Sequence, residues 1–73
     1  MARKEIRSEI TGSVWKIVAK PGDAVGEDDP LIVLESMKME IPVLAEAVGT
    51  VVEILVQEND SVAEGQVVAI IDA

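Results

Sequence analysis

Gly12-Ser-Val-Trp-Lys-Ile-Val-Ala19 recurs 37 positions later as Gly49-Thr-Val-Val-Glu-Ile-Leu-Val56. The same offset aligns the neighbouring segments, pairing residues 21–27 with 58–64 and residues 31–35 with 68–72. Self-similarity at a fixed offset marks a repeated supersecondary unit. The chain therefore contains two similar halves, and residues 37–48 join them.

Each half is predicted to form a strand, a turn and a second strand. Val and Ile dominate the strand segments, and both residues favour β-structure. Gly22 and Asn59 occupy equivalent turn positions, and these two residue types readily adopt positive φ. Asp23 and Asp60 follow them and are expected to hydrogen bond to the turn backbone rather than to take part in chemistry. No stretch keeps a helical period, so no helix is expected.

Neither half is large enough to bury its own apolar face, so we predict one all-β domain with pseudo-two-fold symmetry over residues 1–73. The first strand is expected at about Lys4 to Ile10 and the last at about Gln66 to Ile71. The core must be aliphatic, since Trp15 is the only aromatic residue. The core candidates are Val14, Ile17, Leu31, Val33, Val51, Ile54, Val68 and Ile70.

Four further positions carry specific structural expectations. Trp15 is expected on the outer face, because it alternates with Val14. Pro42 predicts an edge strand, since proline cannot donate to a central ladder. Gly12 and Gly49 begin equivalent strands and are expected to allow tight bends.

Composition excludes several classes of function. The chain has no cysteine and no histidine, which removes disulfides, Cys/His metal sites and the usual base for a nucleophile. The net charge is -8, and beyond Lys20 the only basic residue is Lys38. Such a surface repels phosphate backbones and anionic lipids, so neither nucleic acid nor a membrane is an expected partner. With no apolar segment of spanning or signal type, the expected location is the cytoplasm.

Lys38 stands within Glu35-Ser-Met-Lys-Met-Glu40, at the junction of the two halves. This motif resembles the attachment site of biotinyl domains, in which a lysine between two methionines carries biotin. Pro21-Gly-Asp23 upstream and Gly49-Thr-Val51 downstream lie at spacings that these domains share, as does Ala45. The resemblance covers residues 5–72 and identifies the chain as biotin carboxyl carrier-like, within the biotinyl/lipoyl attachment family. It is either a free-standing carrier or a segment of a longer subunit.

The resemblance implies a flattened β-barrel of two antiparallel four-stranded sheets, the barrel-sandwich hybrid. Lys38 would lie at the tip of an exposed hairpin, in a tight turn between Ser36 and Met39, with the chain termini together at the opposite end. Glu35, Ser36, Met37 and Met39 would be the residues by which enzymes recognise the turn. The two methionines either stay exposed for this purpose or pack partly against the barrel.

In this family a biotin protein ligase joins biotin to the lysine. The arm then carries carboxylate from a biotin carboxylase to a carboxyltransferase, as in acyl-CoA carboxylase systems, and the carrier itself is not an enzyme. Glu35 and Glu40 are expected to favour the ammonium form of Lys38, so that activation comes from the ligase. A monomer is the simplest expectation.

Two alternatives remain open. Lipoyl domains carry lipoate on a lysine usually flanked as Asp-Lys-Ala, whereas Met37 and Met39 occupy those flanks here and favour biotin. The close repeat leaves no room for the protruding thumb of some biotin carriers, a steric filter against lipoate, so a lipoyl carrier or a dual acceptor stays possible. The third reading is an unmodified interaction module.

Overall fold

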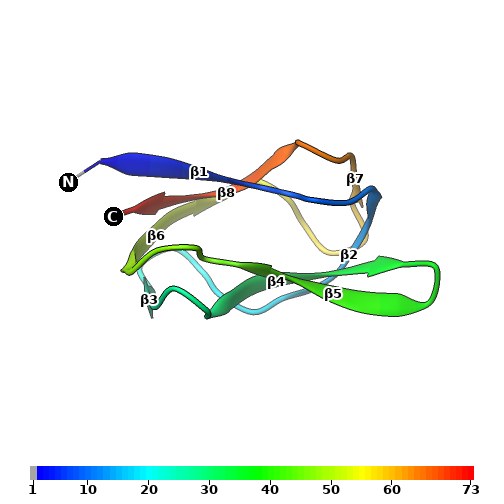
Figure 1. Cartoon of the computed structure of the whole chain (residues 1–73), viewed down its shortest axis with the longest axis horizontal. Helices are drawn as coiled ribbons and strands as arrows, with labels where there is room; N and C mark the ends of the chain where they lie inside the picture. Colours follow the sequence, from blue (N-terminus) through cyan, green and yellow to red (C-terminus); the bar gives the residue numbers. More distant parts are fainter. Residues whose placement is uncertain (1) are drawn as a thin grey trace.

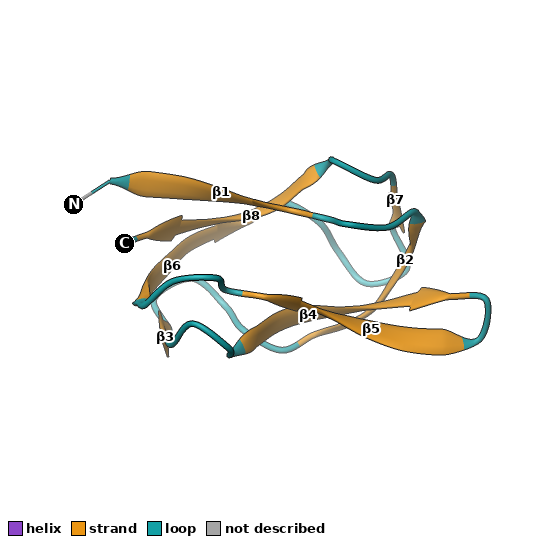
Figure 2. Ribbon diagram, viewed as in Figure 1, coloured by secondary structure: helices purple, strands orange, loops and turns teal. Residues whose placement is uncertain are grey.

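The computed structural model describes residues 2–73, which form eight strands and, in this range, no helix (Figures 1 and 2). No membrane-spanning helix is therefore found among these residues. The molecule is elongated, with extents of 36 × 17 × 17 Å. The strands are β1 (Arg3–Arg7), β2 (Gly12–Ile17), β3 (Ala24–Val25), β4 (Pro30–Ser36), β5 (Met39–Leu44), β6 (Gly49–Ile54), β7 (Ser61–Val62) and β8 (Val67–Asp72).

Two antiparallel four-stranded sheets enclose the core, in the orders β1-β8-β6-β3 and β5-β4-β2-β7. When the chain is divided at the turn between β4 and β5, each sheet takes two strands from each side of the division, so the two parts interleave and neither can bury its apolar face alone. The offset of 37 holds in the strand pairing: Ile6 opposes Ala69 in one sheet, as Val43 opposes Ile32 in the other. The predicted all-β fold with pseudo-two-fold symmetry is confirmed.

The two ends of the molecule are related by the same symmetry. At one end, Ser36 pairs with Met39, and the chain turns between them. At the equivalent place on the other end, Ala73 pairs with Ala2 through two backbone hydrogen bonds of 2.9 and 3.0 Å. The two termini therefore lie side by side, opposite the β4–β5 hairpin (Figure 1).

The equivalent turns of the two halves have the expected chemistry. Gly22 and Asn59 adopt positive φ values of 96° and 75°. The carboxylates of Asp23 and Asp60 each accept a hydrogen bond from the backbone N–H three residues upstream, at 3.1 and 2.8 Å. These bonds hold the turns closed, as predicted.

The core is aliphatic and continuous, as expected, but its membership differs from simple alternation. Irregular pairing at Leu31 in β4 and at the equivalent Val68 in β8 breaks the alternation, so that two consecutive residues are buried at each place. Val33 and Ile70 were expected inside, but each is only half-buried and lies between two inward residues, so it points to the outer face. The buried residues are Ile6, Val14, Ala19, Val25, Leu31, Ile32, Leu34, Val43, Ala45, Val51, Val56, Val62, Val68, Ala69 and Ile71, with Ile17 and Ile54 packed against them.

The first strand is shorter than predicted. β1 ends at Arg7, because the buried Ser8 starts a turn there: its hydroxyl donates to the Ile10 carbonyl at 2.6 Å and accepts from the Ile10 N–H at 3.2 Å. The last strand, β8, begins and ends one residue later than predicted. Two other expectations are confirmed, since Trp15 is 49% exposed and Pro42 lies in β5, an edge strand.

Gly12 and Gly49 do not form the tight bends that we expected. Neither has the positive φ that would require glycine. Instead, each strand begins against the backbone of a neighbour: a Cβ on Gly12 would lie 2.6 Å from the Glu35 carbonyl oxygen, and a Cβ on Gly49 would meet the Asp72 carbonyl oxygen. The two glycines allow the backbones of neighbouring strands to approach closely.

Candidate functional site

The β4–β5 hairpin carries the candidate site on its tip. Ser36 and Met39 form the last pair of its ladder, so Met37 and Lys38 alone make the turn. The hairpin projects from the end of the molecule away from the termini, as the resemblance implied (Figure 1). The structure therefore brings together the motif residues Glu35, Ser36, Met37, Lys38 and Met39 on one projecting element.

Both turn residues adopt the left-handed conformation, with φ of 52° at Met37 and 66° at Lys38. Two-residue hairpins with positive φ at both positions match the twist of the strands, and Asn-Gly is their preferred sequence. For residues with a Cβ the left-handed conformation costs roughly 1–2 kcal/mol each. The paired strands hold this strained backbone, and strained non-glycine residues are concentrated at functional sites.

We expect Met37→Gly to raise the free energy of unfolding by about 1 kcal/mol relative to Met37→Ala. Both variants remove the same exposed side chain, but only glycine relieves the positive φ at position 37. Urea unfolding of the two variants measures the difference. A Met37→Ala protein at least as stable as Met37→Gly would contradict the left-handed turn.

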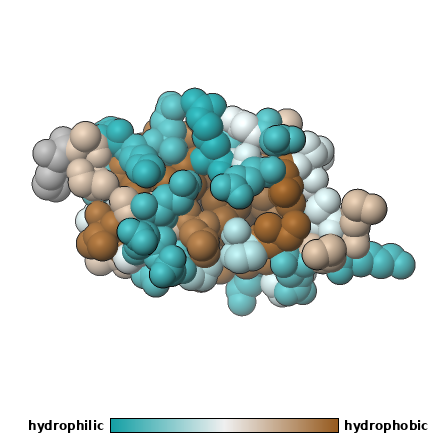
Figure 3. All heavy atoms as spheres, viewed as in Figure 1, coloured by the Kyte–Doolittle hydropathy of each residue, from teal (hydrophilic) through white to brown (hydrophobic). Residues whose placement is uncertain are grey.

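The side chains at the tip are exposed to solvent. Met37 is 91% exposed and Met39 is 62% exposed, and Lys38 is exposed as well. Figure 3 shows the tip projecting beyond the body of the molecule. Of the two alternatives for the methionines, the structure shows exposure rather than burial against the barrel. Exposed, flexible thioether side chains suit a surface that binds more than one protein.

Two glutamates lie beside the turn, on opposite strands of the hairpin. Glu35 opposes Glu40 across the hairpin, one pair below Ser36 and Met39. Within residues 2–73 the only ion pair joins Arg7 and Glu5, so neither glutamate forms an ion pair with the Lys38 ammonium. The amine is thus displayed without an ion-pair partner.

Gly12 supports the site from below, and the sequence did not indicate this role. The missing Cβ of Gly12 would crowd both the Glu35 carbonyl oxygen and, at 3.3 Å, the Ser36 Cβ. Because Gly12 has no side chain, β2 can pack against the part of β4 next to the turn. The sequence does show that glycine recurs at the equivalent positions 12 and 49. This recurrence indicates a requirement for glycine, but it does not show whether the strands approach closely there or the backbone bends.

The arrangement is suited to covalent attachment. An exposed amine on a short, paired hairpin is accessible from most directions, and its backbone is already ordered. Within residues 2–73 no three His, Cys, Asp or Glu side chains are grouped to hold a metal ion. What the site offers is a single primary amine in a defined position.

Comparison with known proteins agrees with this geometry. The sequence model of a family described as "Biotin-requiring enzyme" matches residues 4–71. The "Biotinylated protein TB7.3 homolog" of Mycobacterium leprae is 44% identical over 68 residues, which cover 93% of this chain and 96% of that protein.

Two solved structures share the fold. The urea carboxylase of Kluyveromyces lactis superposes with a TM-score of 0.93 at 40% identity, over 99% of this chain but only 6% of that one. The lipoyl domain of the 2-oxoglutarate dehydrogenase complex from Azotobacter vinelandii gives a TM-score of 0.71 at 35% identity, over 86% of this chain and 80% of that one. With the repeat, the interleaved sheets and the exposed lysine turn, these matches show that the chain belongs to the biotinyl/lipoyl attachment domain family, whose members are non-catalytic carriers.

Proposed function

We propose that Lys38 is covalently biotinylated and that the protein carries carboxylate between a biotin carboxylase and a carboxyltransferase. The observation that carries this proposal is the two-residue turn, which presents one lysine between two exposed methionines. The names of the relatives support the choice of cofactor, since the mycobacterial protein is called biotinylated and the structural match is a urea carboxylase.

Attachment requires chemistry that the partner enzyme supplies. Lys38 must lose a proton to become a nucleophile. Its amine then attacks the carbonyl carbon of a biotinyl adenylate, the C–O bond to the phosphate breaks, AMP leaves and a second proton is released. The product is an amide, so the lysine charge is lost. A biotin protein ligase is the proposed partner for this step. The residues that it recognises are proposed to be Glu35, Ser36, Met37 and Met39.

The domain contributes position rather than catalysis. When bound, biotin supplies a ureido nitrogen that can accept and donate carboxylate. The rigid hairpin and the flexible lysine side chain allow that group to enter one active site and then another, which raises its effective concentration at both. We propose that the carrier acts as a monomer in the cytoplasm.

Intact-protein mass spectrometry of the chain from its native host, with peptide mapping, tests the proposal. We expect one biotinyl mass increment, located on Lys38. An unmodified protein from a host with an active biotin ligase would contradict the proposal and favour an interaction module.

Lipoate on Lys38 is the second candidate, because a lipoyl domain shares the fold at 35% identity. The same mass measurement separates the two cofactors. Incubation of the unmodified protein with each ligase in turn then tests a dual acceptor, and an absence of lipoyl transfer would exclude it.

A further inference from the structure

An apolar pocket of about 170 Å³ opens near the base of the lysine hairpin. It lies between β5 and the segment that follows β1, and Leu34, Ile41 and Ile10 form part of its apolar wall. Figure 3 shows apolar atoms exposed on the body of the molecule beside the projecting tip. Neither the family fold nor the carrier function requires a cavity here.

The end of the pocket at Ile41 is within reach of a modified Lys38. Ile41 lies three residues after Lys38 on β5, which is about 10 Å along an extended strand. A biotinyl-lysine arm has about eleven single bonds between Cα and the ring, so it extends to about 14 Å. Met39 points to the same side of the strand as Ile41 and is 62% exposed, so it continues the apolar surface from the tip to the pocket.

The size and chemistry of the pocket suit the ring of biotin. A cavity of about 150 Å³ accommodates benzene, so 170 Å³ accepts the apolar edge of a small bicyclic ring. Glu9 also lines the pocket, and a carboxylate can accept hydrogen bonds from ureido N–H groups. The dithiolane ring of lipoate has no such donors.

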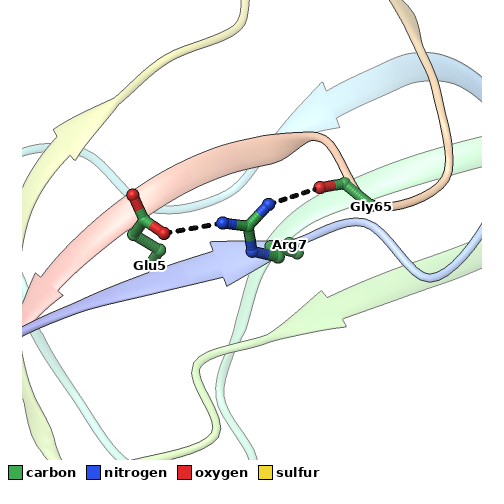
Figure 4. Close-up of polar contacts among 3 residues, drawn as sticks. All are labelled: Glu5, Arg7 and Gly65. Carbon is green, nitrogen blue, oxygen red and sulfur yellow. Dashed lines mark hydrogen bonds and ion pairs between the residues drawn. The ribbon is translucent and has the colours of Figure 1, made fainter.

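Arg7 also lines the pocket. Its guanidinium donates to the Gly65 carbonyl at 2.8 Å and to the Glu5 carboxylate at 2.8 Å (Figure 4). A guanidinium has five N–H groups, so others remain for a ligand carbonyl. The lining therefore includes two acidic residues and one basic residue, Glu9, Glu46 and Arg7, within an otherwise apolar wall.

We propose that this pocket is a resting site for the biotin ring of the protein's own arm, occupied between visits to partner enzymes. The inference rests on the proposed biotinylation of Lys38. In the docked state, the ring of biotin that contains the thioether would be buried from solvent. A partner enzyme could bind the ring only after it leaves the pocket. The site differs from the turn that the ligase recognises, because its wall is formed by β5 and by the segment after β1.

The test uses the full chain biotinylated by a biotin protein ligase, with the adduct on Lys38 verified by mass. We expect attachment to change the backbone amide chemical shifts of Ile10 and Ile41 as well as those of the turn. Ile41→Gln should abolish the change at Ile10 and raise the rate of capture by streptavidin about twofold, as expected if half the arms are docked.

The position accepts a long polar side chain, because its symmetry equivalent is Lys4, which opposes Ile71 as Ile41 opposes Leu34. Val33→Gln is the matched control: Val33 is also half-buried and points to the outer face, but it does not line the pocket. Both variants should keep the amide dispersion of the folded protein.

The outcomes separate the two proposals. Failure of the ligase to modify Lys38 would refute the proposed function itself. Full modification with shift changes confined to residues 36–39, and equal capture rates for the three proteins, would overturn the resting site alone. Shift changes at Ile10 that persist in Ile41→Gln would also count against it.

Discussion

Lys38→Arg is expected to abolish cofactor attachment completely while leaving the fold intact. The guanidinium of arginine stays protonated and has no free electron pair to attack an acyl carbonyl. The side chain at position 38 is exposed and makes no ion pair within residues 2–73, so an arginine there disturbs no packing. The turn keeps a residue with a Cβ, and its strain is therefore unchanged.

The measurement is mass analysis after incubation with a biotin protein ligase, together with thermal unfolding. Lys20→Arg is the matched control, because Lys20 is also exposed but lies outside the hairpin, and it should be modified as fully as the parent protein. An adduct on Lys38→Arg would place the attachment site elsewhere. A lost thermal transition in that variant would contradict the exposed position of the side chain.

Gly12→Ala is expected to lower the free energy of unfolding by about 1–3 kcal/mol, the range for overpacking a tight site. The added methyl group would lie 2.6 Å from the Glu35 carbonyl oxygen, which belongs to β4 and cannot move without disturbing the ladder. A small domain has a stability of only about 5 kcal/mol, so this loss is a large fraction of the total.

Urea unfolding measures this effect, with Gly26→Ala as the control. A Cβ at position 26 would make only an ordinary contact, 3.6 Å from the Asp29 carboxylate, so that variant should lie within about 0.5 kcal/mol of the parent. Equal stability of the two variants would show that the strands relax easily around Gly12. The close-approach account of the hairpin base would then be wrong.

The repeat in the sequence predicted an all-β domain with pseudo-two-fold symmetry, because it aligned strand with strand and turn with turn, while the arrangement in two four-stranded sheets came from the family resemblance. Asp23 and Asp60 bond to their own turns as expected, since that chemistry is local and depends on residues three positions apart. The position of Lys38 followed from the resemblance of its motif. The structure adds the left-handed backbone of Met37 and Lys38, which the sequence did not suggest.

Most of the failed predictions depend on the pairing between strands distant in sequence, and the early end of β1 depends on a local side-chain hydrogen bond. The irregular pairing of β4 between Pro30 and Ile32 places both Leu31 and Ile32 inside, and so Val33 lies outside the core although a uniform alternation from Leu31 would bury it. The hydroxyl of Ser8, which bonds Ile10 and helps end β1, reads from the sequence as an ordinary polar position. The pocket beside Ile41 arises where two segments meet, and no single segment encodes it.

The pairing of Ala2 with Ala73 gives the domain a mechanical property. Both ends of the chain leave from one pole of a body 36 Å long, and Lys38 occupies the other pole. A linker fused to either end would therefore swing the whole body as a stiff lever. The length of the body would then add to the distance that a group on the Lys38 side chain can cover. Neither linker would pass over the surface around Lys38.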